Sequence, residues 1–311
     1  MIVVTGGAGF IGSNILKGLN DAGEKNILVV DNLSNAQKHL NLNRLSFNDY
    51  IDKDDFLLNI GKFTNLKTIF HQGACSSTTE QDGKYMMSNN YEYSKILLNN
   101  WLEHKIDFLY ASSAAVYGNG GNGFTEESKA EYPMNVYGFS KFAFDNYVRR
   151  VMPKAEIQIL GLRYFNVYGP QENHKGRMAS VAFHLFNQLH DSGKMRIFEG
   201  SEEFRRDFIH VEDTVKINLH FYKTKSNGIF NAGTGKSESF MDIARSMKNI
   251  HGNGKIEYIP FPKDLSGKYQ KFTEASLDNL RQAGYSEDFL SLEEGLKKYF
   301  DQLSSSNGFY L

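Results

Sequence analysis

The stretch that decides the fold is residues 1–31, MIVVTGGAGFIGSNILKGLNDAGEKNILVVD. Its apolar run Ile2–Val4 predicts a strand, and glycines at 6, 9 and 12 follow directly. Apolar residues at helical spacing predict a helix over Ser13–Ala22, and the second apolar run, Ile27–Val30, predicts a second strand. A strand, a glycine turn, a helix and a strand in so short a stretch make one βαβ unit.

The glycine turn predicts a dinucleotide site. Glycines let the chain approach a pyrophosphate closely, and the following helix offers free amides and a positive dipole end. A glycine trio alone is weak, but here the strand, the helix and an acidic residue at the second strand's end accompany it. Asp31 is placed to accept a hydrogen bond from the adenosine ribose, which favours NAD. Lys38 and Lys53 could instead balance a 2′-phosphate, or be ordinary solvated lysines, so spacing leaves NAD and NADP open.

The rest of the chain alternates strands and helices up to about residue 166. Strands are predicted at 68–71, 108–112 and 157–162, and helices at 84–104 and 136–151, which favours a doubly wound parallel sheet. Later segments predict helices at 178–189, 242–250 and 291–303 and short strands at 196–198, 208–210 and 256–259. We expect an α/β fold: a Rossmann domain over 1–166, with some later segments returning to it, and a smaller α/β substrate-binding domain over 167–311.

Composition excludes several classes of function. Apolar residues make up 41% and charged residues 23% of 311, and the formal net charge is −1. Such a balance offers no field to attract nucleic acid or an anionic membrane. Without an apolar run of about 18 residues or a leader-like start, a cytoplasmic protein is expected. The single cysteine, Cys75, excludes an internal disulfide and a cysteine-rich metal site, so no metal is expected and a pocket-lining thiol is favoured.

Tyr137 and Lys141 stand four residues apart, on one face of the predicted helix. A nearby ammonium stabilises phenolate, so we expect the tyrosine pKa to fall toward neutrality and the phenol to serve as acid or base. Ser112 and Ser113 end the strand before it. Ser113 could bond a reacting oxygen or merely cap the loop.

Five ordered signatures together resemble the extended short-chain dehydrogenase/reductase family, over essentially the whole chain. They are Thr5–Gly12, Ser112–Gly118, Tyr137–Lys141, Arg163–Pro170 and Arg206–Asp213. The resemblance implies that Lys141 also holds the nicotinamide ribose and that Arg206 faces the pyrophosphate of a sugar nucleotide. It favours redox processing of a nucleotide-linked sugar.

Within that family the chain looks most like the ADP-heptose 6-epimerases of lipopolysaccharide core precursor synthesis, in residues 71–79, 84–87, 173–176, 178–184 and 198–201. This likeness implies NADP rather than NAD, with Lys38 and Lys53 as phosphate ligands. It implies that a hydride leaves C6 and returns to the opposite face, which requires two acid/base groups. Tyr137 is one and Lys175 matches the other; without the resemblance, Lys175 would be a solvated loop lysine.

The same likeness supplies the remaining site residues and the assembly. Arg177 departs from it, since relatives tend to carry a small serine there, near substrate. A homo-oligomer, a pentamer, is implied. The implied cofactor residues are Gly6, Gly9, Phe10, Ile11, Gly12, Asp31, Asn32, Lys38, Lys53, Gln72, Gly73, Ala74, Cys75, Ser76, Asn89, Lys141, Val167 and Lys175. The implied residues for the ADP-sugar are Ser113, Asn166, Arg177, His184, Phe198, Glu199, Gly200, Ser201, Arg206 and Tyr269, and the catalytic ones are Tyr137, Lys175, Lys141 and Ser113.

Three alternative functions require other residue patterns. A UDP-hexose 4-epimerase works with one tyrosine base and does not need Lys175. A 4,6-dehydratase wants an acidic pair directly after the catalytic serine, where this chain has Ala114–Ala115. A cofactor-sensing binding protein could dispense with the Tyr/Lys pair, which is complete here. We therefore expect epimerisation of an ADP-heptose with no net consumption of NADP.

Overall fold

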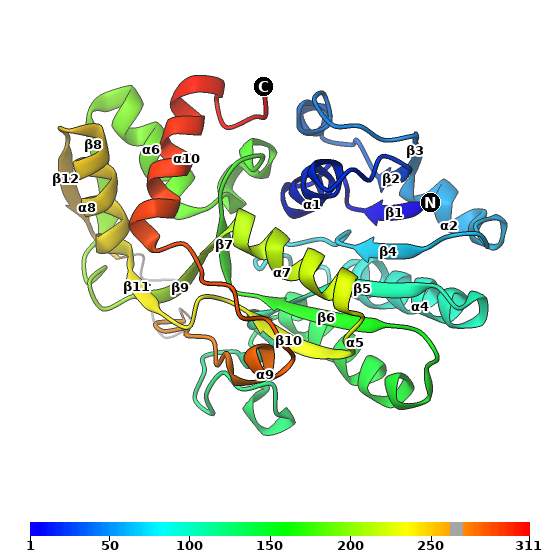
Figure 1. Cartoon of the computed structure of the whole chain (residues 1–311). Helices are drawn as coiled ribbons and strands as arrows, with labels where there is room; N and C mark the ends of the chain where they lie inside the picture. The colour runs from blue at the N-terminus through cyan, green and yellow to red at the C-terminus, as the bar shows by residue number, and fades with distance from the viewer. Residues whose placement is uncertain (262–269) are drawn as a thin grey trace.

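A seven-stranded parallel sheet forms the centre of the computed structural model, which describes residues 1–261 and 270–311 (Figure 1). The strand order is β10-β6-β5-β4-β1-β2-β3, so the order reverses between β1 and β4 and a crevice opens there, at the carboxyl ends of the strands. This confirms the predicted Rossmann-like sheet. The strands are β1 (Ile2–Thr5), β2 (Ile27–Asp31), β3 (Asp49–Asp52), β4 (Thr68–His71), β5 (Asp107–Ser113), β6 (Ile159–Tyr164) and β10 (Gly228–Ala232).

Helices cover both faces of this sheet (Figure 1). On β1, Ile2 and Val4 pack into the apolar cluster that holds α1 and α7, whereas Val3 packs into the opposite cluster with Trp101 and Phe108. A strand that is buried on both faces reads as a continuous apolar run. One layer contains α1 (Phe10–Asp21) and α7 (Val211–Thr224), and the other α2 (Lys53–Leu58), α4 (Tyr93–His104) and α5 (Val136–Val151).

Several predicted helices differ in detail from the observed ones; α1, for example, begins at Phe10, three residues earlier than predicted. The segment 84–104 is divided into α3 (Gly83–Met86), a π-helical turn η3 (Met87–Glu92) and α4, because a π turn adds a residue to the repeat and turns Asn90 inward. α6 (Val181–Ser192) begins three residues later than predicted, since the Ser180 hydroxyl accepts from Phe183 N and caps it there. α5 has the predicted bounds.

A second region packs beside the sheet, at the upper left of Figure 1. Its core includes Tyr168, Leu185, Met247 and Leu296. The three-stranded sheet of β7 (Asn166–Tyr168), β9 (Arg205–His210) and β11 (Ser237–Ser239) adjoins it, with the pair β8 (Lys194–Phe198) and β12 (Lys255–Ile259), and with α6, α8 (Phe240–His251) and α10 (Leu292–Ser306).

The chain passes between the two regions more than once. β10 pairs with β6 in parallel and so joins the large sheet, and α9 (Asp278–Gln282) lies close to β10. Neither α7 nor β10 was among the elements predicted from sequence. Short 3-10 turns complete the structure: η1 (Ala36–Asn41), η2 (Ile60–Lys62), η4 (Ala114–Tyr117), η5 (Ser128–Ala130), η6 (Met152–Lys154) and η7 (Asn173–Met178). In residues 1–261 and 270–311, no helix has the length and apolarity needed to cross a bilayer.

Candidate active site

A cavity of about 950 Å³ opens at the carboxyl ends of β1, β4 and β5, where β7, η7 and β9 also reach it. Segments from residue 5 to residue 240 contribute to its wall. Most residues that the sequence nominated for a site lie on this wall. They are Gly6, Gly9, Phe10, Ile11, Gly12, Asp31, Asn32, Lys38, Lys53, Gln72, Gly73, Ala74, Cys75, Ser76, Asn89, Ser113, Tyr137, Lys141, Asn166, Val167, Lys175, Arg177 and Arg206.

The glycine turn leaves no room for side chains. Gly6 has φ +67°, and a Cβ there would lie 2.6 Å from Gly73 N. A Cβ on Gly12 would lie 2.1 Å from Gly6 O. Gly9 caps α1 without a side-chain hydrogen bond. The turn therefore presents close-packed backbone and the amides of a helix N-terminus to the cavity, which suits a phosphate group.

Charged side chains gather at the end of β2. The Asp31 carboxylate accepts from Ala8 N at 2.9 Å and from Lys38 Nζ at 2.8 Å, and it is almost fully buried. Lys38 Nζ also donates to the Asn32 carbonyl at 3.0 Å. Lys53 reaches the same wall and pairs with Asp54 at 2.6 Å. The structure thus brings Asp31, Lys38 and Lys53 to one end of the cavity.

Tyr137 and Lys141 project from the first turns of α5 toward the end of β5. A hydrogen bond joins Ser113 to Tyr137, and Ser113 Oγ also accepts from Ala115 N at 3.1 Å, so this hydroxyl both faces the phenol and caps η4. Lys141 is buried, and its Nζ donates to the Ala111 carbonyl at 2.7 Å. Burial lowers the pKa of Lys141 to about 8, and the Asp145 carboxylate opposes that change.

The expected fall in the tyrosine pKa was wrong in direction. Burial raises the pKa of the Tyr137 phenol, the bond with Ser113 acts the opposite way, and the nearby Cys75 thiol adds to the rise. Lys141 donates to a backbone carbonyl instead. Helical spacing places two side chains on one face, but desolvation decides the charge of the phenol.

A network of buried charges lies behind α5. The Asp145 carboxylate accepts from the hydroxyls of Tyr110 at 2.8 Å and Ser112 at 2.9 Å, and from Arg163 Nε at 2.9 Å. Glu131 pairs with Arg163 from the other side. Asp145 and Lys141 lie on successive turns of α5. The network around Asp145 therefore fixes the helix that carries the Tyr137/Lys141 pair.

A directed hydrogen-bond chain connects the glycine turn with α5. Ser94 Oγ donates to the Asn90 carbonyl at 2.5 Å, so it must accept from His71 Nε2, 2.7 Å away. His71 Nδ1 then accepts from Thr5 Oγ1 at 2.6 Å, which fixes the tautomer of the ring. Burial, helped by Lys141, lowers the pKa of His71 to about 3, so the ring is neutral at neutral pH.

Asn90 ends this chain and holds the loop after β4. Its side chain accepts from Cys75 N at 2.8 Å and donates to Cys75 O at 2.9 Å, which fixes the half-buried thiol on the cavity wall. It also reaches Ser140 Oγ at 3.2 Å, and that hydroxyl donates to Tyr137 O. The sequence pointed to Asn89, which lines the cavity, and missed Asn90. The sequence Asn-Asn-Tyr would have identified Asn90 as a site residue only if the π turn had been predicted as well.

Lys175 comes from η7 and also lines the cavity. Its ammonium nitrogen lies 5.1 Å from the centre of the Phe10 ring, on the glycine turn. Burial lowers the pKa of Lys175, and the neighbouring Glu172 carboxylate raises it. His174 on the same loop has a pKa lowered to about 4, by burial and by Lys38 and Lys175. Lys175 thus brings an ionisable amine to the cavity that Tyr137 also lines.

The nominated residues of β8 and α6 are not brought to this wall. His184 on α6 and the stretch Phe198–Ser201, which starts at the last residue of β8, lie outside the set that lines the cavity. Ser201 is buried, and its Oγ has no hydrogen-bond partner within the described residues. Arg206 does line the cavity, and its Nη1 donates to the Arg205 carbonyl. Tyr269 lies outside the described residues.

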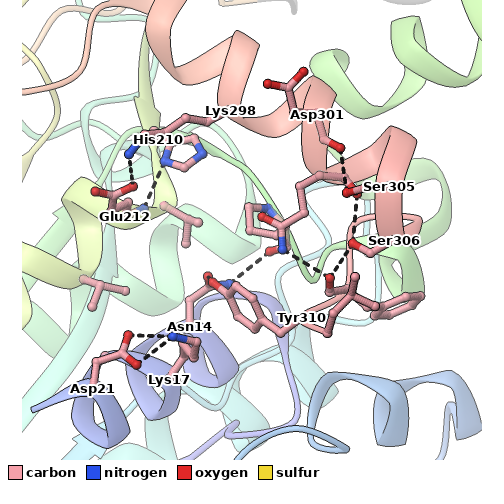
Figure 2. A pocket seen from close by; sticks show the side chains of 17 residues that line it. Asn14, Lys17, Asp21, His210, Glu212, Lys298, Asp301, Ser305, Ser306 and Tyr310 are labelled. Carbon is pink, nitrogen blue, oxygen red and sulfur yellow. Dashed lines mark hydrogen bonds and ion pairs between the residues drawn. The ribbon is translucent and has the colours of Figure 1, made fainter.

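A second hollow, of about 730 Å³, lies between α1, α7 and α10 (Figure 2). Its lysines are paired: Lys17 with Asp21 and Lys298 with Glu212, each at 2.7 Å. Asn14 accepts from the Tyr310 hydroxyl and donates to the Phe10 carbonyl. The residues around this hollow therefore support the glycine turn from behind. The larger cavity is the candidate site. Over 1–261 and 270–311, no cluster of three or more His, Cys, Asp or Glu side chains could hold a metal.

Comparison with known proteins agrees with this geometry. A profile of the NAD dependent epimerase/dehydratase family matches residues 2–233. The chain is 58% identical over 318 residues to the ADP-L-glycero-D-manno-heptose-6-epimerase of Brachyspira hyodysenteriae, with 100% of both chains covered. It is 30% identical to the crystal structure of the Helicobacter pylori enzyme of that name, with a TM-score of 0.84 and 98% and 96% coverage. The Thermotoga maritima UDP-glucose 4-epimerase, solved with UDP-glucose, has a TM-score of 0.84 at 28% identity, with 98% and 99% coverage.

Proposed function

The chain belongs to the NAD-dependent epimerase/dehydratase family, and from this premise we propose that it epimerises C6 of an ADP-linked heptose. The reaction would interconvert ADP-D-glycero-D-manno-heptose and ADP-L-glycero-D-manno-heptose. The full-length relative at 58% identity carries the name of that enzyme, which supports this substrate over other sugar nucleotides. The chain is then an isomerase that consumes no coenzyme overall.

One observation carries the proposal: Tyr137 on α5 and Lys175 on η7 both face a single cavity. Removing a hydride from one face of a carbon and returning it to the other calls for proton transfer at two positions. A phenol and an amine from separate elements can serve both. A 4-epimerase that uses one tyrosine gives no part to a lysine placed like Lys175.

The cavity fits a dinucleotide, because the glycine turn is a cradle that any Cβ at Gly6 or Gly12 would fill. We assign the pyrophosphate to this turn and the adenosine ribose to the end of β2. NADP is favoured over NAD, since Lys38 neutralises the buried Asp31 carboxylate and Lys53, paired with the exposed Asp54, lies on the same wall. When bound, the dinucleotide supplies the acceptor and the donor of the hydride.

Residues of the chain then transfer the protons, orient the cofactor and bind the substrate. Tyr137 holds or releases a proton at its phenol oxygen, with Ser113 bonded to it. Lys141 orients the cofactor ribose with its buried ammonium, and Lys175 moves the second proton. Asn166, Arg177 and Arg206 line the cavity toward the ADP-sugar. His184, Phe198, Glu199, Gly200, Ser201 and Tyr269 complete the proposed substrate set.

The test is an assay of the purified protein without added coenzyme, on ADP-heptose and on UDP-glucose in parallel. We expect interconversion of the two C6 epimers of ADP-heptose and release of NADP on denaturation. Formation of UDP-galactose with ADP-heptose left untouched would replace this function by that of a 4-epimerase. Release of NAD alone would overturn only the coenzyme assignment.

We also propose a homo-oligomer, a pentamer, acting in the cytoplasm in synthesis of lipopolysaccharide core precursors. The likeness to ADP-heptose 6-epimerases supports this setting. Light scattering of the purified protein tests the assembly, since each chain has a mass of 35.4 kDa. A monomeric mass would remove the oligomer without touching the chemistry.

A further inference from the structure

Glu172 is a fully buried carboxylate to which the proposed reaction gives no part. Its Oε2 accepts from Ser180 N at 2.6 Å, and its Oε1 accepts from the Ser180 hydroxyl at 2.6 Å. The same Oε1 accepts from the Tyr299 hydroxyl at 2.9 Å. One side chain therefore joins the start of η7, the N-cap of α6 and the middle of α10.

These bonds close the loop that carries Lys175. Lys175 N donates to Glu172 O at 2.9 Å, and Gly176, at φ +52°, turns the chain back toward Ser180. Both ends of the loop thus meet at Glu172. Asn173 Nδ2 donates to the Asn307 carbonyl at 2.8 Å and supports the loop from outside.

Charge couples the same two residues. Burial lowers the pKa of the Lys175 ammonium, and the Glu172 carboxylate acts against it. His174, with a pKa of about 4, is neutral at neutral pH, and Arg177 is exposed. The other charged or titratable groups on the cavity wall are Asp31, Lys38, Lys53, Tyr85, Tyr93, Cys75, Tyr137, Lys141, Tyr164 and Arg206, and Tyr299 lies behind Glu172.

We propose that Glu172 is a positioning residue for Lys175: it fixes the loop and keeps the amine protonated until a substrate oxygen takes the proton. The inference rests on the proposed function only in making Lys175 the second acid/base. A buried carboxylate is costly unless it is hydrogen-bonded. Ser180 and Tyr299 supply the hydrogen bonds, and the carboxylate acts on the nearby Lys175 ammonium without a direct ion pair.

The substitution Glu172→Gln separates charge from shape. The glutamine oxygen can still accept from Ser180 N. Its amide can donate to the hydroxyls of Ser180 and Tyr299, because hydroxyl groups accept as well as donate. The loop keeps its bonds while the negative charge is lost.

The readout is the acylation rate of individual lysines in the purified protein, measured by peptide mass spectrometry across neutral and alkaline pH. Only the neutral amine reacts, so Lys175 of Glu172→Gln should react several-fold faster at neutral pH, with its profile displaced to lower pH. Lys154 is exposed on η6 and serves as the internal standard, with an unchanged rate. Superimposable Lys175 profiles would overturn the proposal.

Tyr299→Phe is the matched control, because it removes one hydrogen bond and keeps the carboxylate. We expect a lower urea midpoint and an unchanged Lys175 profile. An equal displacement in both variants would overturn the proposal in favour of simple packing. Should Glu172→Gln fail to fold, Glu172→Asp withdraws the charge by one methylene and should move the profile in the same direction; an unmoved profile again contradicts us.

Turnover then links the effect of Glu172 on Lys175 to the reaction. In Glu172→Gln the pH limb of kcat that depends on Lys175 should move to lower pH, and KM should change little. In a Lys175→Met background the same substitution should leave the pH profile of the residual turnover unmoved, since the two residues act as a unit. If ADP-heptose is not a substrate while the acylation profile shifts, the proposed function fails and the positioning role of Glu172 stands. If epimerisation proceeds and the profile does not shift, only the positioning role fails.

Discussion

Tyr137 and Lys175 face one cavity from elements that are held in different ways. Tyr137 stands in the first turn of a 16-residue helix that is braced from behind by Asp145 and Arg163. Lys175 stands on a six-residue 3-10 turn with a kink at Gly176, and Glu172 closes it at both ends. The regular backbone hydrogen bonds of the helix hold Tyr137 in place, whereas the position of the turn depends on contacts with α6 and α10. One side of the site is thus set by secondary structure and the other by tertiary structure.

The largest expected effect is on turnover, and it tests whether the two sides carry equal chemistry. Tyr137→Phe and Lys175→Met should each cut kcat by about 10²–10⁴-fold, because positioned acid/base groups contribute that much. Epimer interconversion measures the loss. Tyr132→Phe and Lys154→Met, both at exposed positions, are the matched controls and should retain activity. An unimpaired Lys175→Met enzyme would mean that Tyr137 is the acid/base group and that Lys175 takes no part in proton transfer.

The next effect is on stability and should fall on the helix side alone. Arg163→Met leaves Asp145 and Glu131 buried without one of their cations, so the free energy of unfolding should drop by about 3–5 kcal/mol. Urea unfolding followed by circular dichroism measures it. Arg150→Met, exposed at the end of α5, is the control. A loss of stability in Lys175→Met as large as in Arg163→Met would remove the contrast between the two sides.

A smaller effect is the pH dependence of stability caused by His71, which lies in the hydrogen-bond chain that joins the glycine turn to α5. His71 has a pKa of about 3 in the folded chain and 6.5 as the ordinary value, so the unfolded chain binds more protons between these values. Stability therefore falls as pH drops below 6.5. From pH 6.5 to about 4.5, the wild type should lose about 2 kcal/mol more than His71→Gln. Equal slopes in urea titrations would mean that His71 is not kept neutral.

The smallest effect is on coenzyme choice, at the end of the cavity to which the Lys175 loop is tied by the bond from Asn35 to the His174 carbonyl. Lys38→Ala should weaken NADP about tenfold relative to NAD, since a charge-assisted hydrogen bond to phosphate is lost. Titration calorimetry gives both Kd values. Lys25→Ala, exposed before β2, is the control. A parallel loss for both dinucleotides would assign Lys38 to structure rather than to phosphate recognition.

The same contrast explains what could be predicted from the sequence. The βαβ unit, the parallel sheet and the Tyr137/Lys141 spacing follow from local patterns, and the structure confirms the sheet and the helix bounds of α5. The charge of the Tyr137 phenol was predicted in the wrong direction, because desolvation depends on packing.

Other parts of the site rest on partners that are distant in sequence. Lys175 was found by resemblance alone. Glu172 and Tyr299 are hydrogen-bonded although 127 positions separate them, and Asn90 and Ser140 are hydrogen-bonded over a separation of 50. Asn90 also lies in a π turn that helical periodicity does not predict. No local pattern encodes such partners. The substrate contacts and the boundary near residue 166 stay predictions.

The pairing of β10 with β6 has a consequence for the growing chain. β6 ends at Tyr164, but its outer neighbour is not synthesised until residues 228–232. Until then a wholly buried strand presents bare amide and carbonyl groups along one edge, which invites pairing with another chain. A fragment that stops after β6 keeps this edge permanently. We therefore expect the nascent protein to be prone to aggregation while the sixty-odd residues between the two strands are synthesised, the stretch that also builds η7 and α7.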